Sequence, residues 1–269
     1  MHFTIILPIK NEAEFISTSL QSILDQKYLK KDYEIIISDG GSTDGTLEIL
    51  IFYLSKYPHI TLLHNIEGIV STGFNLALNK AKGDVIIRVD GHCEIPPHYI
   101  NNCVNLLKLK DADIVGGCIE TVSDGIIGRA ISIAQSSLFG VGGVKFRNSN
   151  NSKSTYVDTL AFGAHKREIF SGIGGYDEEM VCNQDDEFNF RAIQAGKKIW
   201  MDQSIKTKYH SRSSFRKLFK QYFNYGYYKI RGIQKRGQII SIRHLIPATL
   251  VISLIGTSIF GYFLQLPWI

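Results

Sequence analysis

Short apolar runs alternate with helical patterns along the first 90 residues. Four runs rich in Ile, Val and Leu have the length of buried strands: residues 3–7, 33–37, 60–63 and 84–89. Between them, apolar residues recur at helical spacing over residues 11–24, 46–57 and 68–82. Largely apolar strands separated by helices indicate an α/β doubly wound fold with a mostly parallel sheet flanked by helices. Ligands of such sheets bind at the carboxyl ends of the strands.

A different pattern follows in the last quarter of the chain. An amphipathic helix is expected from Ser213 onward, with one apolar and aromatic stripe: Phe215, Leu218, Phe219, Tyr222, Phe223 and Tyr227. Basic residues lie off this stripe, which either packs on the body of the domain or lies on a membrane surface.

An uncharged segment of 20 residues runs from Leu245 to Leu264. As a helix it would measure roughly 30 Å, the thickness of a bilayer core. Basic residues precede it, as expected on a cytoplasmic side. We expect a membrane-spanning or membrane-embedded helix here, with a buried core helix as the alternative.

Charge is distributed unevenly. The net charge of +5 comes from 30 Lys and Arg against 25 Asp and Glu. Residues 203–269 contain 11 Lys and Arg and no acid, which leaves 19 basic and all 25 acidic residues, a net charge of −6, for residues 1–202. The protein is therefore expected to be an acidic body with a basic tail. The tail's aromatics and its apolar neighbour fit a membrane surface better than a nucleic acid.

Cysteines and the N-terminus exclude other classes. Cys93, Cys103, Cys118 and Cys182 form no CxxC pair, so they are expected to be reduced thiols in a cytosol-like compartment. The chain enters its first apolar run without a basic leader or a cleavage site, so no signal peptide is expected. No GxGxxG follows the first run, which argues against an NAD-dependent dehydrogenase.

Polar residues follow the first two predicted strands. Asp39 directly follows a buried strand and leads the segment Asp39-Gly40-Gly41-Ser42-Thr43-Asp44-Gly45-Thr46, and Pro8-Ile9-Lys10-Asn11-Glu12 follows the first strand. A carboxylate at Asp39 can accept a hydrogen bond from a base or ribose, and two such strand ends predict a nucleoside pocket. Asn11 and Asp44 are alternatively explained as helix caps.

A second pair of carboxylate-bearing segments lies further on. Asp90 and His92, in Arg88-Val89-Asp90-Gly91-His92, are two residues apart and would point the same way in extended chain. An oxygen and a nitrogen ligand at this spacing suit Mn²⁺ or Mg²⁺ on a diphosphate. In Asn183-Gln184-Asp185-Asp186-Glu187, one carboxylate at a helix start could serve as a general base. The alternative, which suits Glu187 best, is acidic residues matching the helix macrodipole.

Taken together, these segments resemble the inverting glycosyltransferases of family 2, which have a GT-A fold. The segment 39–46 resembles the DxxSxDGT element, Asp90-Gly91-His92 the DxD motif, Gly174-Gly175-Tyr176-Asp177-Glu178 the GGFDE element, and Gln184-Asp185 with Arg191 the ED…R segment. The subgroup most similar in pattern is the succinoglycan-type bacterial exopolysaccharide glucosyltransferases, which share DGH, NQDDE and a stretch like Lys220–Gly226. The similarity covers roughly residues 3–230.

The resemblance implies roles for individual residues. Asp185 would be the catalytic base, with Asp186 as its rival because Gln184 replaces the usual Glu. The metal ligands would be Asp90, His92 and His210, holding Mn²⁺ or Mg²⁺. The nucleotide sugar would be held by a larger set, in which Asp39 faces uracil: Pro8, Asn11, Glu12, Asp39, Ser42, Asp44, Arg88 and Asp90.

The resemblance, together with the charge and hydropathy pattern of the tail, implies domains, substrates and location. Residues 1–210 would be the catalytic domain, with a nucleotide-sugar half (1–115) and an acceptor half (116–210). Residues 211–244 would be a basic membrane-interface segment, and 245–269 a membrane segment that we expect to be cut short. The expected reaction moves a hexose from a UDP-sugar to a lipid-linked saccharide at the cytoplasmic face of the cell membrane. The alternative is a nonenzymatic nucleotide-sugar-binding subunit of a polysaccharide assembly complex.

Overall fold

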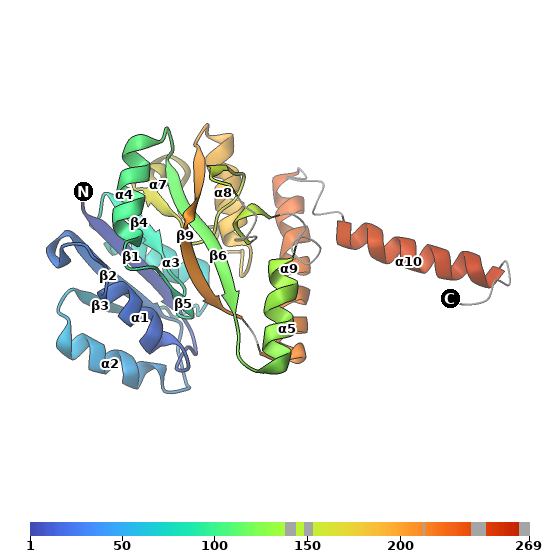
Figure 1. Cartoon of the computed structure of the whole chain (residues 1–269), viewed down its shortest axis with the longest axis horizontal. Coiled ribbons are helices and arrows are strands. Elements are labelled where there is room, and N and C mark those ends of the chain that lie inside the picture. The colour runs from blue at the N-terminus through green and yellow to red at the C-terminus, as the bar shows by residue number, and fades with distance from the viewer. Residues whose placement is uncertain (138–143, 148–152, 212, 238–245, 264–269) are drawn as a thin grey trace. The chain divides into compact units, whose positions relative to one another are not determined.

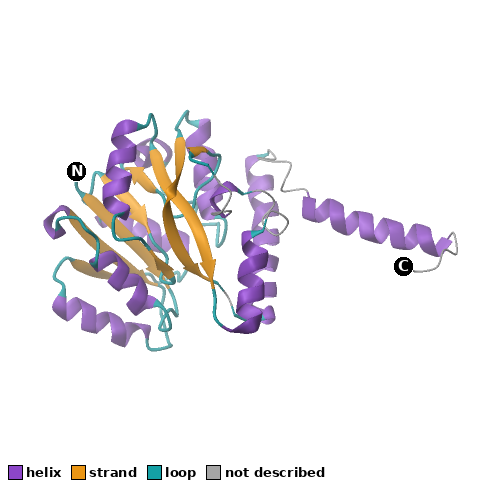
Figure 2. Cartoon of the chain, viewed as in Figure 1, coloured by secondary structure: helices purple, strands orange, loops and turns teal. Residues whose placement is uncertain are grey.

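The computed structural model describes residues 1–137, 144–147, 153–211, 213–237 and 246–263. It divides into two units, Met1–Tyr228 and Lys229–Ile269. The first unit holds a sheet with helices on both faces (Figure 2).

The elements follow one another in this order: β1 (Phe3–Ile9), α1 (Ile16–Leu24), β2 (Tyr33–Asp39), α2 (Thr46–Lys56), β3 (Ile60–His64), α3 (Val70–Lys80), β4 (Val85–Arg88), β5 (Cys93–Glu94), α4 (Tyr99–Leu109), β6 (Ile114–Val122), α5 (Gly125–Ser136), β7 (Thr155–Tyr156), β8 (Ala164–Lys166), α7 (Glu168–Ile173), α8 (Gln184–Gln194), β9 (Ile199–His210), α9 (Phe215–Arg236) and α10 (Ile246–Phe263). Short 3₁₀ turns lie at Lys30–Asp32 and Lys145–Arg147.

The first half of the sheet confirms the predicted parallel arrangement. Strands β3, β2, β1 and β4 lie side by side in this order and run parallel. All residues of β1 and β4 are buried, since helices α1 and α2 lie in front of the sheet and α3 behind it (Figure 1). Strand order reverses between β1 and β4, and the crevice beside such a reversal is where open α/β sheets bind ligands.

The second half of the sheet is mixed, which the sequence pattern did not predict. Strand β8 runs antiparallel to both β4 and β6, whereas β6 and β9 run parallel. Strands β5 and β7 pair antiparallel with β9. Only three residues long, β8 is too short for hydrophobic periodicity to reveal its direction.

A glycine lets the longest strand pair continue past an irregularity. The register between β6 and β9 shifts between Gly117 and Cys118. A Cβ on Gly117 would lie 2.1 Å from the backbone oxygen of Ile205, so no other residue fits there without moving β9. Beyond the shift, the pair runs on to Val122 and His210, which carries His210 to the sheet's edge near the site.

The apolar segment near the C-terminus forms α10, whose described side chains are mostly exposed. Its 18 residues measure about 27 Å at about 1.5 Å per residue. No helix among the described residues has the length and apolar character needed to cross a membrane. The prediction of a membrane-spanning helix from Leu245 to Leu264 is therefore not supported, and its two end residues lie outside the described part of the chain.

Candidate active site

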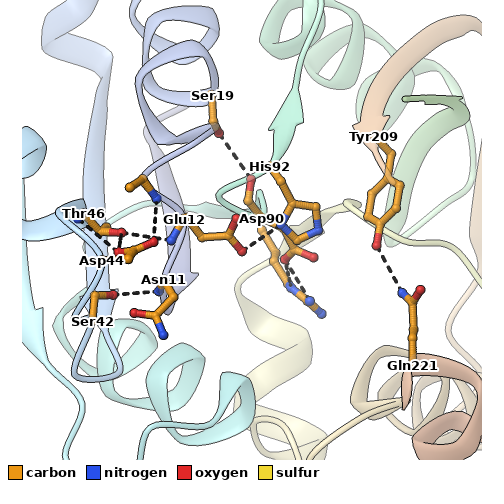
Figure 3. Close-up of polar contacts among 12 residues, drawn as sticks. Asn11, Glu12, Ser19, Ser42, Asp44, Thr46, Asp90, His92, Tyr209 and Gln221 are labelled. Carbon is orange, nitrogen blue, oxygen red and sulfur yellow. Dashed lines mark hydrogen bonds and ion pairs between the residues drawn. The ribbon is translucent and has the colours of Figure 1, made fainter. Parts of the chain in front are cut away.

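The ends of β1 and β4 meet through a buried pair of side chains. His92 Nδ1 lies 2.8 Å from Glu12 Oε1, and both side chains are about nine-tenths buried (Figure 3). Gly91 makes room for this contact, because a Cβ there would lie 2.8 Å from Glu12 Cγ. Two residues predicted to bind different parts of a ligand therefore bind each other, at the reversal point of the strand order.

The loop after β1 is fastened to the loop after β2. Asn11 has a left-handed backbone, with φ of 56°. Its N–H donates to Ser42 Oγ at 2.8 Å, and its Oδ1 accepts from Thr43 N at 2.8 Å. Glu12 N donates to Thr46 Oγ1 at 2.9 Å. The sequence pattern predicted a helix that begins near Asn11. These bonds explain why α1 begins only at Ile16.

Asp44 joins the same two loops. Its carboxylate accepts from Ala13 N at 3.1 Å and from the N–H of Thr46, also at 3.1 Å. Desolvation raises the pKa of Asp44, but the hydrogen bonds from Thr46 and Ala13 outweigh it and hold the pKa below its ordinary value. Asp44 thus stabilises the start of α2 in its charged form by accepting from the N–H of Thr46, although the N-cap residue of α2 is Gly45, which makes no side-chain cap bond.

Asp39 is buried and organises its own turn. Its Oδ2 accepts from the N–H groups of Gly41 and Ser42 at 3.0 and 3.1 Å, and Ser42 Oγ donates to its Oδ1. Ser42 therefore contacts both Asp39 and Asn11. The contact between Asp39 and a nucleobase stays a prediction. The hydrogen bonds show that Asp39 shapes the turn after β2.

The end of β4 carries a buried cation–carboxylate pair. Arg88 is 7% exposed, and its Nε and Nη2 lie 2.9 and 2.8 Å from Asp90 Oδ1. The Arg88 guanidinium carbon also lies 5.7 Å from the centre of the Tyr176 ring. Burial opposes the charge on Arg88, but Asp90, Tyr176 and Asp185 hold its pKa above its ordinary value. Arg88 is thus a permanent positive charge that pairs with Asp90 and interacts electrostatically with Asp185.

Asp185 lies in the first turn of α8. Its Oδ1 accepts from the N–H of Asp186 at 2.9 Å. Burial raises the pKa of Asp185, the charge of Arg88 opposes this, and the charges of Asp186 and Asp90 add to it. A carboxylate with a raised pKa is a stronger base, which is the property that proton abstraction from a hydroxyl requires.

Neighbouring Glu187 has a different task. It forms a salt bridge with Arg191 at 2.7 Å, one helical turn further along α8. Arg191 also donates to the carbonyl oxygens of Gly175 and Ile173. Glu187 and Arg191 therefore connect α8 to the segment 174–178, and this pairing occupies the Glu187 carboxylate.

Helix α3 holds the segment 174–178 from the other side. Asn75 Oδ1 accepts from Tyr176 N at 2.8 Å, and Asn75 Nδ2 donates to Tyr176 O at the same distance. Gly175 packs so closely that a Cβ would lie 2.2 Å from Asn75 Oδ1. The Tyr176 ring stacks on Phe74, with centres 4.2 Å apart. Asn75 was not singled out from the sequence, since a lone Asn inside a helix carries no signal.

The three predicted metal ligands do not form a ready-made site. Asp90 is bound by Arg88, His92 by Glu12, and His210 Nε2 lies 2.7 Å from Glu94 Oε1. Among the described residues, no three His, Cys, Asp or Glu side chains gather closely enough to hold a metal ion. The arrangement therefore does not fit a cation held jointly by these three residues.

Helix α9 supplies two site residues that sequence reasoning did not assign. Gln221 Nε2 donates to the hydroxyl of Tyr225 at 2.9 Å and reaches that of Tyr209 at 3.5 Å (Figure 3). Asn183, which precedes α8, donates to the backbone oxygen of Tyr225 at 3.1 Å. The charge of Asp185 contributes to a raised pKa of Tyr225, after the larger effect of burial. The inward face of α9 thus lies beside the candidate base.

An α/β domain with this strand order, and with carboxylates at the carboxyl ends of β1, β2 and β4, has the architecture of glycosyltransferases of the GT-A type. Residues 4–170 match the family model described as glycosyl transferase family 2, and the chain belongs to this family. The predictions of this family, of a GT-A-like α/β fold and of a glycosyltransferase are confirmed.

Two curated relatives match most of the chain. It is 31% identical over 245 residues to the succinoglycan biosynthesis protein ExoA of Rhizobium meliloti, covering 90% of this chain and 73% of that protein. It is 27% identical over 266 residues to a dolichyl N-acetyl-alpha-D-glucosaminyl phosphate 3-beta-D-2,3-diacetamido-2,3-dideoxy-beta-D-glucuronosyltransferase of Methanococcus voltae, covering 96% of this chain and 81% of the relative.

Solved structures show the same fold at low identity. The mannosyltransferase PcManGT of Pyrobaculum calidifontis, in complex with GDP-Man and Mn²⁺, has a TM-score of 0.66 at 19% identity over 91% of this chain and 67% of its own. S. aureus TarS 1-349, in complex with UDP-GlcNAc, has a TM-score of 0.62 at 19% identity over 80% of this chain. The chain spans 60% of that TarS chain.

Proposed function

We propose that the protein is an inverting hexosyltransferase. It moves a hexose from UDP-glucose or a related UDP-sugar to a hydroxyl of a lipid-linked saccharide, in bacterial exopolysaccharide or cell-surface glycan synthesis. The observation that carries the proposal is Asp185, a carboxylate with a raised pKa within electrostatic reach of the Arg88–Asp90 pair. The names of the Rhizobium and Methanococcus relatives support the class of product and the lipid-linked acceptor.

In the proposed mechanism, Asp185 acts as the base on one face of the sugar and the diphosphate leaves from the other. Asp185 takes the proton of the acceptor hydroxyl as its oxygen bonds to the anomeric carbon. On the opposite face, the bond from that carbon to the diphosphate breaks, and the diphosphate leaves with the electron pair. The carbon gains oxocarbenium character on the way, as in glycoside hydrolysis. Attack from the face opposite the leaving group inverts the configuration.

The donor is held at the carboxyl ends of β1, β2 and β4. In the proposal, the loops carrying Asn11 and Ser42 border the nucleoside, and Arg88 faces the diphosphate with its positive charge. Mn²⁺ or Mg²⁺ belongs to the proposal with Asp90 as its ligand, because such ions are commonly held by one or two carboxylates plus substrate phosphates. When bound, the ion would offset the charge of the leaving diphosphate. The PcManGT complex with GDP-Man and Mn²⁺ supports this pairing.

The proposed location is the cytoplasmic face of the cell membrane. Two observations support it. The chain from Gln203 to its end has no acidic residue, and α9 exposes aromatic side chains, Phe219 and Phe223 among them. Basic segments of this kind bind anionic leaflets.

The proposal is tested by sugar transfer with purified protein. Candidate donors are first compared by thermal shift, with and without Mn²⁺: UDP-glucose, UDP-galactose, UDP-N-acetylglucosamine and GDP-mannose. Asp185→Asn is then expected to lose about 100- to 10,000-fold in turnover while donor binding stays near that of the wild type. Asp186→Asn is the matched control and is expected to keep most of the turnover. Full turnover of Asp185→Asn, or its loss in Asp186→Asn alone, would refute the assignment of the base.

A further inference from the structure

We infer that α5 and the first half of α9 form one lipid-binding surface, which rests on the headgroup region of an anionic bilayer. This inference rests on the proposed function, because it specifies how a lipid-linked acceptor reaches the site. The lipid-binding surface is defined here as the outward faces of residues 125–136 and 215–228.

The aromatic stripe of α9 points away from the domain. Phe215, Phe219 and Phe223 are 64%, 74% and 64% exposed. The opposite face of the same helix carries Gln221, whose Nε2 reaches the hydroxyl of Tyr209 on β9, and Tyr225, whose hydroxyl accepts from Gln221 and whose backbone oxygen accepts from Asn183. The stripe therefore does not pack on the body of the domain, which was one of the two expectations from the sequence.

Helix α5 exposes an apolar face as well. Ile126 and Ile133 are 85% and 71% exposed, whereas Ile131 and Gln135 on the inward face are buried. Exposed apolar side chains are common singly, but a group on two helices marks an interaction surface. The sequence pattern gave no signal for α5, since its Ile residues alternate with small ones.

The two helices leave the sheet at the same place. Strands β6 and β9 run parallel, and Val122 at the end of β6 pairs with His210 at the end of β9. Ser211 N donates to Val122 O at 2.9 Å, and Ser123 Oγ donates to Ser211 O at 3.4 Å. Helices α5 and α9 therefore follow segments that are hydrogen-bonded to each other at the ends of β6 and β9.

The charge of this surface selects anionic lipid as its occupant. Neither α5 nor α9 contains Asp or Glu. Arg129 on α5 and Arg216, Lys217 and Lys220 on α9 are exposed. Aromatic and aliphatic side chains flanked by Lys and Arg, with no acid among them, suit the boundary between headgroups and acyl chains. A protein partner would have to be both apolar and acidic to fit the same face.

The surface lies one helix away from the candidate base. Tyr225 on the inward face of α9 is bonded through its backbone oxygen to Asn183, which immediately precedes α8 and Asp185. A helix with its side chains is about 10 Å across. An acceptor whose lipid tail stays in the bilayer would therefore need only a short saccharide to bring its hydroxyl to Asp185.

The first test places a fluorescent probe on the surface of the full chain. The variants Phe219→Trp, Ile127→Trp and Ile51→Trp are mixed with vesicles of phosphatidylcholine and phosphatidylglycerol at 3:1 that carry brominated acyl chains. Ile127 is 45% exposed on α5, and Ile51, 62% exposed on α2, is the matched control. Quenching of the added Trp is expected at 219 and 127 and not at 51. Quenching at 51 equal to that at 219, or none at 219 and 127, overturns the inference.

The same probe distinguishes other occupants. If the Trp added at 219 is already shielded from iodide before vesicles are added, the chain or a second copy covers the face and the inference is wrong. If it is quenched only by pure phosphatidylcholine vesicles, the occupant is not an anionic surface, and the inference is wrong in that respect too.

The second test measures the role of charge. Lys217→Gln combined with Lys220→Gln is expected to lower partitioning into the 3:1 vesicles by about 25-fold, since each basic residue near an anionic surface contributes about fivefold. The control pair, Lys30→Gln with Lys31→Gln at the Lys30–Asp32 turn, is expected to lower it by no more than about twofold. An equal loss in both pairs overturns the inference.

These tests are separate from those of the proposed function. Hydrolysis of the donor by water, measured without vesicles, requires the site around Asp185 but not the lipid-binding surface. If vesicle binding fails while donor hydrolysis persists, only the surface is wrong. If hydrolysis fails for every donor while Trp at 219 is quenched, the surface stands and the proposed function does not.

Discussion

His92 and Glu12 form a buried pair, with Nδ1 and Oε1 2.8 Å apart, although 80 residues separate them in the chain. The single variants His92→Leu and Glu12→Leu are each expected to lower the free energy of unfolding by about 1–3 kcal/mol, because each leaves a buried polar group without its partner. The double variant should lose less than the sum of the two, by about 1 kcal/mol or more. Denaturant unfolding measures all three.

A control for this cycle uses an acid elsewhere on the domain. Glu67→Leu changes an exposed carboxylate, so its effect should add to that of His92→Leu within about 0.5 kcal/mol. Additive effects in the Glu12–His92 cycle itself would show that the contact contributes nothing to folding.

The pH dependence of transfer should reflect Asp185. Because burial raises the pKa of Asp185, its protonated and inactive form persists to higher pH than for an ordinary aspartate. The acid limb of kcat/KM should therefore lie above the usual range of carboxylates. Arg88→Met removes the opposing positive charge and should move this limb to higher pH. Asp186→Asn removes a neighbouring negative charge and should move it to lower pH. Shifts of the same sign in both variants would contradict this account.

The stability of the domain should fall in mild acid because of His165. This side chain is 3% exposed, and its burial lowers its pKa to about 4. In the unfolded chain the pKa is about 6.5, so the unfolded state binds a proton first as the pH falls. The contribution of His165 to the free energy of unfolding is therefore complete above pH 6.5. It is lost as the pH falls towards 4, and the total loss is about 3 kcal/mol. Urea unfolding at pH 7 and pH 4.5 measures this, and His165→Gln should show a smaller difference.

Because Gly175 lies so close to Asn75, the effect of Gly175→Ala on stability should depend on the side chain at position 75. Gly175→Ala should lower the free energy of unfolding by about 1–3 kcal/mol, because the new methyl would lie 2.2 Å from Asn75 Oδ1. In the Asn75→Ala background the obstacle is gone, and the same change should have less than half that effect. Gly172→Ala is the control, since nothing lies within 4 Å of its Cβ position and α7 favours Ala. Thermal unfolding resolves these differences, and an equal effect of Gly175→Ala in both backgrounds would rule out the contact as the cause.

The sequence predicted the strands and the polar residues at their ends, because buried parallel strands leave long apolar runs that end in polar loops. It did not predict that Glu12 and His92 bind each other. That contact depends on β4 lying beside β1, and periodicity within a strand carries no information on its neighbours. The tertiary arrangement also decides that Asp185 acts on the charge of Arg88 and that His210 meets Glu94.

The orientation of helix α9 could not be predicted from the sequence either. Its hydrophobic pattern identified which residues share a face, but not which face would meet the domain. The Gln221 side chain reaches the hydroxyl of Tyr209, and Asn183 donates to the backbone oxygen of Tyr225; both partners lie outside α9. The aromatic stripe is left outside as a result.

The bond from Asn183 to the backbone of Tyr225 also affects how relatives should be compared. The family match ends at residue 170, before α8, β9 and α9 begin. A fragment trimmed to the matched region would keep the loops around Asn11 and Asp90 and lose Asp185 together with the helix that borders it. Under the proposed function, an alignment trimmed in this way compares only the loops assigned to the donor. A comparison of acceptors would have to include residues 171–228.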